Sequence, residues 1–334
     1  MLNNIEKAVQ QVHQNVSFDL SDWDKLTTDA STVSVFHLKS TVEYYCSYYD
    51  GKNLSFIIIE NNEPIALLPL LIHEENGWTL SSNGEGLIGP LFKKHISRKL
   101  KKRVVKEIVE IVELIGKEAK SKKIRLFEPF SSISNWYLHW LERADNHYLT
   151  YQMGIDLNKT LEEIRLDFRK SYKPLVNKAL REWQVEICEK NNIDSVFDEF
   201  RLLHLEAAGK ITRSEESWEI QKKQIKNNEA FLVTVRDKSV LIGAGFFNHS
   251  KDIGMYSVGA YRRDLFDKPI GHAVQMLAIT KLKDLGCKVY HLGQKAVLLH
   301  STSPSKKEIS ISHFKEGFAG YIYTQPHLEV NLGS

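Results

Sequence analysis

A lysine lies between two aromatic residues near the carboxyl end of the chain. Residues 312–320 read SHFKEGFAG, which places Lys315 directly after Phe314 and three residues before Phe318. A fixed cationic donor in a partly dry site stabilises the negative oxygen that forms when a nucleophile attacks an acyl carbon, a contribution of roughly 3–4 kcal/mol. The plainer alternative is a surface lysine beside two core aromatics. We take Lys315 as a candidate catalytic residue and Phe314 as part of the binding site around it.

Gly271 and His272 form a second candidate group, at the start of a predicted helix. The exposed backbone N–H groups of a helix N-terminus attract anions, which makes Gly271 a candidate binding residue. His272 could orient an acceptor or relay a proton, with a pKa lowered by the positive end of the helix. A capping or packing histidine is the alternative reading of the same position.

Two arginines, Arg262 and Arg263, precede that helix. Arginine forks bind phosphates and carboxylates in two-point contacts, so both residues are candidates for binding a substrate. Asp264 and Asp267 stand in the same loop and are alternative partners for them.

Three other positions complete the candidate binding site. Lys210, Thr212 and Arg213 follow a predicted helix stop and precede a capped helix, a corner that suits an anion or simply caps the helix. Tyr256 lies on a predicted strand and is a candidate contact for the acceptor, with a core position as the alternative. Gln294 ends the strand that follows the helix, close to where a substrate would lie.

A strand, a helix and a second strand must position these residues. Alternation up to Tyr261 predicts a strand, apolar residues at helical spacing predict a helix over 270–285, and residues 287–292 predict a further strand. A crossover of this length brings the chain back to a parallel strand of the same sheet. Ligands of such units bind outside the carboxyl end of the first strand, beside the helix N-terminus, where Arg262, Arg263, Gly271 and His272 stand.

The composition indicates an ordinary globular protein with two lobes. The chain has 334 residues, of which 42% are apolar and 26% charged, and this length exceeds what one core usually supports. Three scattered cysteines, Cys46, Cys188 and Cys287, argue against a disulfide framework and against a metal site. The N-terminus lacks the apolar core of a signal peptide, and no apolar run is long enough to cross a bilayer, so we expect a cytoplasmic protein.

The order of predicted elements repeats in the two halves of the chain. Strands over 54–60, 64–73 and 78–82 form a meander that leads through a helix to a strand at 123–127. Strands over 230–236, 240–248 and 253–261 lead through the helix at 270–285 to a strand at 288–292. A helix that opens with a capping box at Thr160 and Glu163 is expected to be interrupted near Pro174. The repeated order predicts a divergent internal duplication.

The duplicated order, the segment 256–260, Pro269 with His272, the strand CKVYHLG and the motif F-K-x-G-F-x-G resemble the FemABX-like branch of the GNAT superfamily. The resemblance covers nearly the whole chain. It implies an α+β (α/β) fold of two tandem GNAT-like lobes, each with a mixed, mostly antiparallel sheet flanked by helices. The lobes are expected at 1–150 and 151–320, the second carrying the catalytic cleft, with a strand over 321–334 returning to the first.

The same resemblance implies an acyltransferase or aminoacyltransferase that forms an amide on an amine of a cell-envelope or polysaccharide precursor. No tightly bound cofactor is expected, and the co-substrate is aminoacyl-tRNA or acyl-CoA. The pyrophosphate-binding signature Q/R-x-x-G-x-G/A of ordinary GNATs is absent, which counts against acetyl-CoA, and the helical-hairpin arm of some Fem ligases is absent too. The alternatives are a CoA-dependent N-acyltransferase acting on an amino sugar or nucleotide sugar, and a catalytically silent scaffold of envelope biosynthesis.

Positive charge is concentrated in one segment. Residues 93–125 hold thirteen basic and four acidic residues, a net charge of +9 in a chain whose net charge is +3. Such a surface suits tRNA phosphates or the inner face of an anionic membrane, and DNA is not expected as a partner. A solvated helix face is the alternative.

Overall fold

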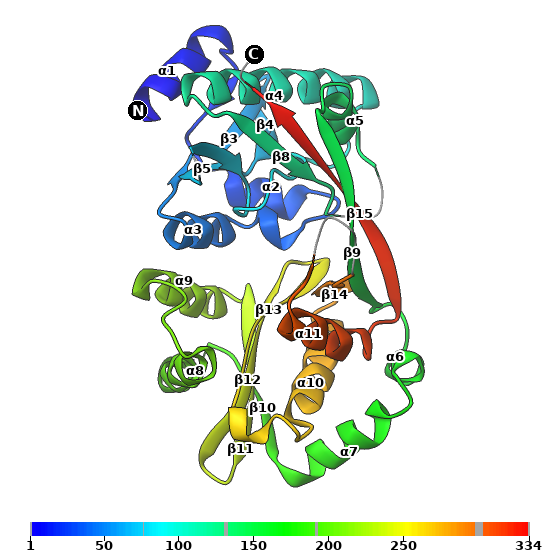
Figure 1. Cartoon of the computed structure of the whole chain (residues 1–334). Helices are drawn as coiled ribbons and strands as arrows, with labels where there is room; N and C mark the ends of the chain where they lie inside the picture. The colour runs from blue at the N-terminus through cyan, green and yellow to red at the C-terminus, as the bar shows by residue number, and fades with distance from the viewer. Residues whose placement is uncertain (1, 76, 130–132, 191–192, 298–302, 333–334) are drawn as a thin grey trace. The chain divides into compact units, whose positions relative to one another are not determined.

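The chain folds into two compact units, as seen in a computed structural model that describes residues 2–75, 77–129, 133–190, 193–297 and 303–332 (Figure 1). The first unit comprises residues 1–150 and 324–334, and the second comprises residues 151–323. The division falls inside two strands, β9 (Asn146–Asp156) and β15 (Tyr321–Asn331), so that each strand contributes residues to both units. Among the described residues, no helix combines the length and apolar character that a bilayer crossing requires.

The first unit holds two sheets and five α-helices within the described residues. The larger sheet has the strand order β2-β5-β6-β8-β15 and the smaller one the order β1-β3-β4-β7. The strands before β9 are β1 (Val16–Ser17), β2 (Lys52–Asn53), β3 (Phe56–Glu60), β4 (Glu63–Leu68), β5 (Leu71–Glu74), β6 (Trp78–Ser81), β7 (Leu91–Phe92) and β8 (Lys123–Phe127). The helical elements are α1 (Leu2–Val12), α2 (Trp23–Asp29), η1 (Val35–His37), α3 (Lys39–Tyr48), α4 (Arg98–Glu118) and α5 (Asn135–Leu141).

The predicted strand over 64–73 is wrong as a single element. It divides at Pro69 into β4 and β5, which belong to different sheets. Proline has no backbone N–H, so it cannot continue a ladder on both sides. The Pro69 carbonyl instead accepts a hydrogen bond from the Ser82 hydroxyl at 2.7 Å. The continuous apolar run that suggested one strand is therefore two buried strands in succession.

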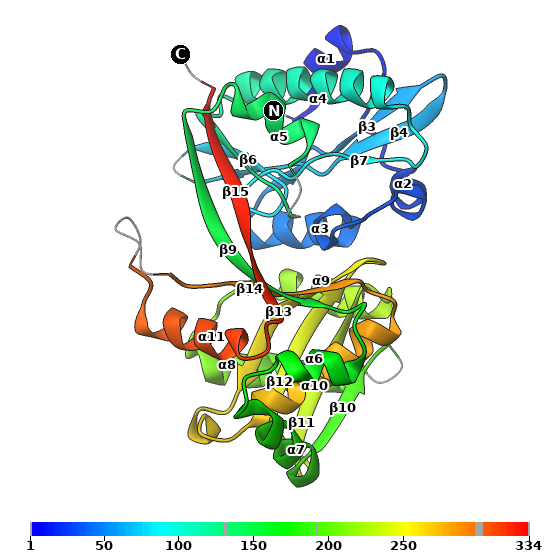
Figure 2. The same cartoon turned by 90° about the vertical axis from the view of Figure 1, so that its right-hand side faces the viewer.

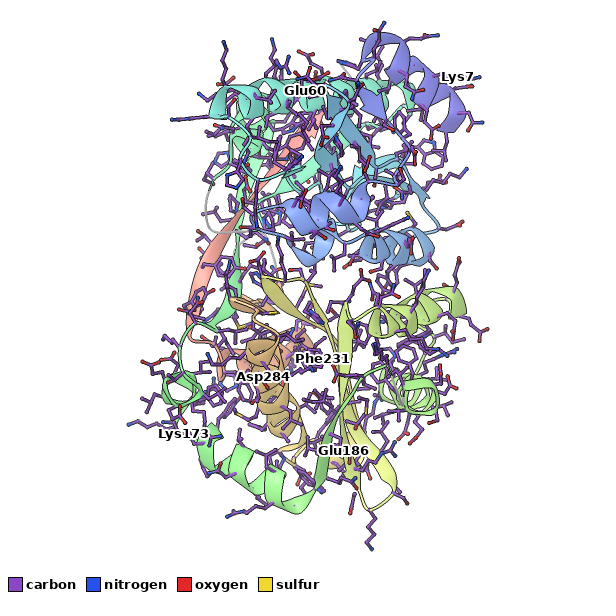
Figure 3. All side chains as sticks on the ribbon, turned by 180° about the vertical axis from the view of Figure 1, so that it is seen from behind. Lys7, Glu60, Lys173, Glu186, Phe231 and Asp284 are labelled. Carbon is purple, nitrogen blue, oxygen red and sulfur yellow. The ribbon has the colours of Figure 1, made fainter. Side chains whose placement is uncertain are left out.

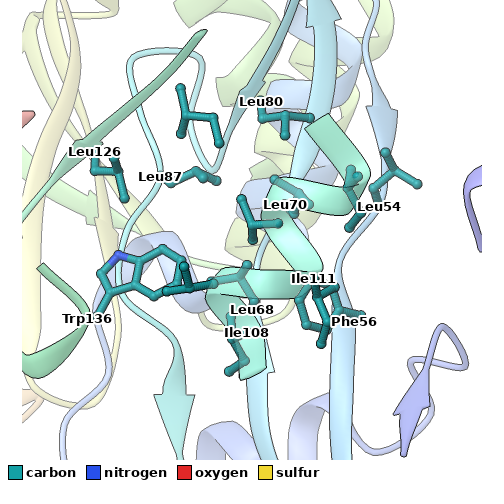
Figure 4. Packing of buried hydrophobic residues seen from close by; sticks show 14 of the residues in the cluster. Leu54, Phe56, Leu68, Leu70, Leu80, Leu87, Ile108, Ile111, Leu126 and Trp136 are labelled. Atoms are coloured by element: carbon teal, nitrogen blue, oxygen red, sulfur yellow. The ribbon is translucent and has the colours of Figure 1, made fainter. Parts of the chain in front are cut away.

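Helix α4 packs its apolar stripe into the core of the first unit (Figure 4). Ser97 caps the helix by accepting a hydrogen bond from the Leu100 N–H. Ile108 and Ile111 are fully buried and lie in one cluster with Leu68, Leu80 and other apolar residues of the strands. The indoles of helix α5, at 136 and 140, complete that cluster.

The second unit is a single sheet of order β10-β11-β12-β13-β14-β9 with helices on its faces (Figure 2). Its strands are β10 (Gln184–Cys188), β11 (Ala230–Asp237), β12 (Val240–His249), β13 (Ile253–Tyr261) and β14 (Val289–Gln294), besides β9. Its helical elements are α6 (Leu161–Asp167), α7 (Tyr172–Glu182), α8 (Ile193–Ala208), α9 (Glu215–Lys226), η2 (Arg263–Leu265), α10 (Ile270–Asp284) and α11 (Lys306–Glu316). Side chains such as Phe231 fill the space between this sheet and α10 (Figure 3).

The two units repeat one strand arrangement. In the first unit β5 and β6 are antiparallel, β6 and β8 are parallel, and β8 and β15 are antiparallel. In the second unit β12, β13, β14 and β9 are paired in the same sequence of directions. Helices α4 and α10 make the two crossovers between the parallel strands. The predicted tandem, mostly antiparallel α+β fold is thus confirmed.

The helix break predicted near Pro174 lies a few residues earlier. Helix α6 begins with the predicted capping box, in which Thr160 and Glu163 each bond the other's backbone N–H. It ends at Asp167, and α7 begins at Tyr172, so Pro174 falls in the first turn of a helix. Proline is well tolerated in that turn because the N–H that it lacks has no partner there. The break itself is an extended segment at Phe168 that turns the chain toward α11.

Candidate active site

A β-bulge in β13 brings two tyrosines to the same face of the sheet. Phe246 pairs with Val258 and Phe247 with Tyr256, so Ser257 is the extra residue. Residues five apart on a regular strand point to opposite faces, and one extra residue restores the same face. The Tyr256 and Tyr261 hydroxyls accordingly lie 3.0 Å apart in a hydrogen bond.

The bulge is held in place by buried hydrogen bonds. The Ser257 hydroxyl donates to the Asn248 side-chain oxygen at 2.7 Å, and the Asn248 amide donates to Gln224 of helix α9 at 3.0 Å. Both Asn248 and Gln224 are buried. The position of Tyr256 is therefore fixed by the helix on the opposite face of the sheet.

The parallel strands β13 and β14 part just before this bulge. Their pairing extends from Ile253–Val289 to Met255–His291 and ends there, although both strands continue. A second bulge, at Leu292 of β14, turns Gly293 toward the face that carries Tyr256, since Gly293 pairs with the core residue Met153. The carboxyl ends of β13 and β14 are thus not paired with each other. This is the location at which the sequence predicted a ligand.

Lys315 reaches this point from the last turn of α11. Its ammonium lies 5.2 Å from the centre of the Tyr256 ring, within cation–π distance. A Cβ built on Gly293 would lie 2.8 Å from Lys315 Nζ, so the ammonium occupies this position because residue 293 is glycine and would shift if it were alanine. Among the described residues, Lys315 Nζ has no hydrogen-bond or ion-pair partner. Burial without an acidic partner lowers the pKa of Lys315 to about 8, which leaves the group mostly protonated at neutral pH.

The helix that carries Lys315 is fixed by the break between α6 and α7. The Arg169 side chain donates to the His313 carbonyl at 3.1 Å, and the Arg169 backbone N–H donates to the Gly317 carbonyl at 2.8 Å. The Tyr172 hydroxyl donates to the Phe314 carbonyl at 3.1 Å. A Cβ on Gly317 would lie 2.1 Å from the Tyr172 ring, so the glycine of the motif is required by this close packing.

His272 lies in an aromatic cluster rather than in an open site. Its ring centre is 4.4 Å from that of Tyr172, 5.3 Å from that of Phe314 and 5.6 Å from that of Phe318. Both imidazole nitrogens are buried and have no partner among the described residues. Burial, followed by the charge of Arg169, lowers the pKa of His272 to about 4, so the imidazole is neutral at pH 7.

Phe314 is the residue that joins the predicted site positions. Besides its contact with His272, it packs on the start of α10, where a Cβ on Gly271 would lie 2.9 Å from its ring. Gly271, His272, Phe314, Lys315 and Tyr256 therefore form one connected group.

The three predicted arginines lie elsewhere in the second unit, and Gln294 directly follows Gly293 in β14. Arg262 forms a two-point ion pair with Asp264, at 3.1 and 2.8 Å, which is the alternative considered from the sequence. Arg263 donates twice to the Ala207 carbonyl, at 2.9 and 2.6 Å, and so caps the carboxyl end of α8. Gln294 is exposed at the end of β14. Arg213 lies beside α9 with its guanidinium 4.4 Å above the Trp218 ring.

Several residues that shape this site were not identified from the sequence. Tyr172 and Arg169 lie in the helix break that was ascribed to Pro174, and Gly293 carried only the signal of a strand end. Tyr290 donates to Gln275 at 2.6 Å beneath the site, and the Gln275 amide nitrogen is buried without a partner among the described residues. Gly293 has a positive φ of +113°. A glycine at the end of a predicted strand could have suggested such a backbone conformation.

Comparison with known proteins gives similarity at the level of structure. No family model matches the sequence, and no curated protein sequence matches it. The crystal structure of FemX is similar with a TM-score of 0.67 and 11% identity, over 93% of this chain and 96% of that one. L-PGS from Bacillus licheniformis gives a TM-score of 0.60 and 10% identity, over 95% and 93% of the two chains.

A third similar structure is a tandem GNAT protein from the clavulanic acid biosynthesis pathway. Its TM-score is 0.50 at 11% identity, over 98% of this chain and 96% of that one. Identities this low establish the fold alone. The resemblance predicted from the sequence motifs is confirmed at that level: the chain has a tandem GNAT-like fold that is similar to the fold of FemX.

Proposed function

We propose that this protein is an acyltransferase or aminoacyltransferase that forms an amide on an amine of a cell-envelope or polysaccharide precursor. The observation that carries the proposal is the Lys315 ammonium, half-buried and unpaired among the described residues, over Tyr256 and against Gly293 where β13 and β14 part. A partly buried cation without an acidic partner lowers stability, and groups of this kind are typical of functional sites.

The chemistry follows from what a fixed ammonium can do. The amine nitrogen of the acceptor attacks the carbonyl carbon of the donor ester or thioester, and the carbonyl oxygen becomes an oxyanion. Lys315 donates a charge-assisted hydrogen bond to that oxygen. When the oxyanion collapses, the bond from carbon to the ester oxygen or thioester sulfur breaks, the amide remains, and the leaving group takes up the proton released by the amine.

Phe314 and His272 act in this proposal by positioning Lys315. Phe314 precedes Lys315 in α11 and packs on Gly271 and His272 at the start of α10. Since both nitrogens of His272 are buried, we assign it a neutral packing role instead of the proton relay considered from the sequence. Tyr256 lines the site under the ammonium, and Gln294 lies one residue beyond Gly293 as a contact for the acceptor.

The donor is aminoacyl-tRNA or acyl-CoA, and the acceptor is a small amine or a glycan precursor. The similar tandem GNAT structure is of a form without AcCoA, which names a CoA thioester as a ligand to consider. A CoA thioester is therefore among the donors to be tested. The absent pyrophosphate signature favours aminoacyl-tRNA. The charged segment at 93–125, with Lys99, Lys102 and Lys106 exposed along α4, supports contact with tRNA or with an anionic membrane face.

A donor screen tests the proposal. Acetyl-CoA, longer acyl-CoA thioesters and pools of charged tRNA are each incubated with the protein and amine-bearing sugar nucleotides or muropeptides, and acylated products are identified by mass spectrometry. We expect one donor class to yield an amide product, and Lys315→Met to reduce kcat about 10²-fold or more. Lys170→Met is the matched control, because Lys170 is exposed and lies outside the site.

The screen also separates the alternatives. An amide formed with acyl-CoA alone indicates the CoA-dependent N-acyltransferase, and one formed with charged tRNA alone indicates the Fem-type reaction. A protein that forms no product with any donor, and whose binding of envelope-biosynthesis proteins is unchanged in Lys315→Met, is the silent scaffold, and the transferase proposal fails.

A further inference from the structure

The outer side of helix α8 and the start of α9 enclose a pocket that is separate from Lys315. It has a volume of about 550 Å³ and is lined by α8, by residues 210–213 and by the first turn of α9. Pockets that hold small ligands have volumes of roughly 300–1,000 Å³, so this one is large enough for a molecule of drug-like size.

One side of the pocket consists of apolar side chains that are open to solvent. Ile211 is 81% exposed and Leu202 67% exposed, and Leu205 and Trp218 continue the same wall. Single exposed apolar residues are common, but three of them around one concave site mark a surface that a ligand or partner covers. Covering these side chains removes apolar area from water, which favours binding of a hydrocarbon group.

The other side of the pocket carries positive charge. Lys210 and Arg213 line it and have no acidic partner among the described residues. The other charged groups there compensate one another: Arg201 pairs with Glu215 at 3.4 Å, and Asp198 lies 3.9 Å from an ammonium of α9. The pocket therefore has a net positive side next to an apolar one.

Arg213 is oriented and only partly used. Its guanidinium stacks 4.4 Å from the Trp218 ring centre, and its Nη1 donates to Gln221 at 3.0 Å. Its Nε is buried without a hydrogen-bond partner among the described residues, and so is the hydroxyl of neighbouring Thr212. Buried donors are nearly always satisfied, so this corner holds two donors whose hydrogen bonds are not made within the described residues.

His204 contributes no charge to the pocket at neutral pH. Burial, followed by the charges of Arg213 and Lys307, lowers the pKa of His204 to about 4. Its ring lies 5.1 Å from that of Trp218 and forms part of the wall.

We propose that this pocket binds an amphiphilic anion: a phosphate or carboxylate at Lys210, Thr212 and Arg213, with an attached hydrocarbon group against Leu202, Leu205 and Ile211. The apolar wall favours a ligand with a hydrocarbon group, and the two cations without an acidic partner favour a ligand with a negative charge. The site goes beyond the proposed transfer reaction, and its test needs no acyl donor, so the two proposals can fail separately.

Isothermal titration calorimetry with the whole chain tests the site, using n-octyl phosphate at concentrations where it is monomeric. Three other probes separate the contributions: octanoate, the uncharged n-octyl glucoside, and inorganic phosphate. We expect both anionic amphiphiles to bind, and n-octyl glucoside and inorganic phosphate each to bind about tenfold more weakly or not at all. Raising the salt concentration weakens binding of the anions. Absence of n-octyl phosphate binding overturns the proposal, as does equal binding of n-octyl glucoside.

Variants locate the binding. Lys210→Gln is expected to weaken n-octyl phosphate binding about threefold to tenfold, and Ile211→Asn about threefold. Both residues are exposed, so neither change should unfold the protein. Lys170→Gln and Leu166→Gln are the matched controls, because Leu166 is 71% exposed on α6 outside the pocket. If the controls weaken binding as much as the pocket variants do, the ligand lies elsewhere and the proposal is wrong.

Discussion

At the scale of single residues, Lys315 combines a cost in stability with a chemical use. Its ammonium lies over the Tyr256 ring and against Gly293 and has no carboxylate partner within the described residues. The folded state therefore holds the proton less tightly than the unfolded chain does, as the pKa of about 8 shows. A group in this state donates strongly to an oxyanion, because the transfer of negative charge to the bound oxygen offsets its unfavourable burial.

The activity is expected to fall as the pH rises through about 8. Only protonated Lys315 can stabilise the oxyanion, and its pKa is lowered to about 8 by burial. The measurement is kcat/KM from pH 6 to 10 for the wild type and for Lys315→Arg, whose guanidinium stays charged throughout. The arginine variant should retain part of the activity without the alkaline decline. An identical decline in both proteins would assign it to another group.

The same shift predicts how stability depends on pH. The pKa of Lys315 is lower in the folded state, so the unfolded chain binds more protons between pH 8 and 10.5 and wild-type stability rises across that window. Below pH 8 the unfavourable burial is fully present. Lys315→Met should accordingly be more stable than the wild type at pH 7, by on the order of 1–3 kcal/mol, and lose that advantage by pH 10.5. Urea denaturation at both pH values measures the difference.

His272 provides a test of packing against chemistry. Because both ring nitrogens are buried without partners, His272→Phe should keep the aromatic contacts, remove two unsatisfied polar atoms and leave kcat within about threefold of the wild type. His272→Ala should leave a cavity beside Phe314 and reduce both stability and kcat. Melting temperature and single-turnover rates distinguish the two. A large loss of rate in a stable His272→Phe protein would restore the proton relay.

At the scale of elements, the site depends on where β13 and β14 stop pairing. Two bulges act together: the one at Ser257 aims Tyr256, and the one at Leu292 presents Gly293. The ammonium of Lys315 lies where a side chain at position 293 would displace it.

Gly293→Ala should displace the ammonium and lower kcat about tenfold or more. Its Cβ would lie 2.8 Å from Lys315 Nζ, closer than such atoms approach. The backbone at 293 has φ +113°, so the change also costs about 1 kcal/mol or more of stability. Gly286→Ala is the matched control, because φ is +79° there and nothing lies within 4 Å of the new Cβ. The control should lose stability with an unchanged kcat, and equal kcat in both variants would argue against this role of Gly293.

The sequence predicted helix α10 and its crossover, but it missed helix α11, which carries Lys315, and the irregular parts of the site. Periodicity located α10 because an apolar stripe is a local property, and the aromatic motif singled out Lys315. The apolar periodicity could not show that the chain passes from one sheet to another at Pro69, because the strands on both sides of Pro69 are apolar and buried. Strand β9 and the bulge at Ser257 were also missed, because pairing and register depend on residues far along the chain. For the same reason the ion pair of Arg262 could only be posed as an alternative, and the contact of Arg263 with the Ala207 carbonyl was not predicted.

At the scale of the whole molecule, the first unit is built from two distant parts of the chain. Strand β15 pairs with β8, from His327–Phe127 to Asn331–Lys123, and Leu328 is fully buried in the core with Leu126 and Trp136. The second unit is inserted between these parts in sequence.

Leu328→Ala should therefore destabilise the first unit, although Leu328 lies almost 180 residues beyond Thr150, where the first part of that unit ends. The loss of a fully buried leucine costs about 2–5 kcal/mol. Hydrogen exchange should accelerate along β8 and α4, with β11 and β12 less affected. Ile322→Ala, at a side chain that is 43% exposed, is the control. Unchanged protection of β8 in Leu328→Ala would show that β15 adds little to that sheet.

The place of β15 in the first unit also bears on how the protein is made. During translation, residues 1–150 leave the ribosome long before residues 324–331 are synthesised. The edge of β8 that pairs with β15 is therefore unpaired while the second unit is being synthesised. Nascent first units are then exposed to edge-to-edge association with one another, and a chaperone that shields this strand would raise the yield of native protein.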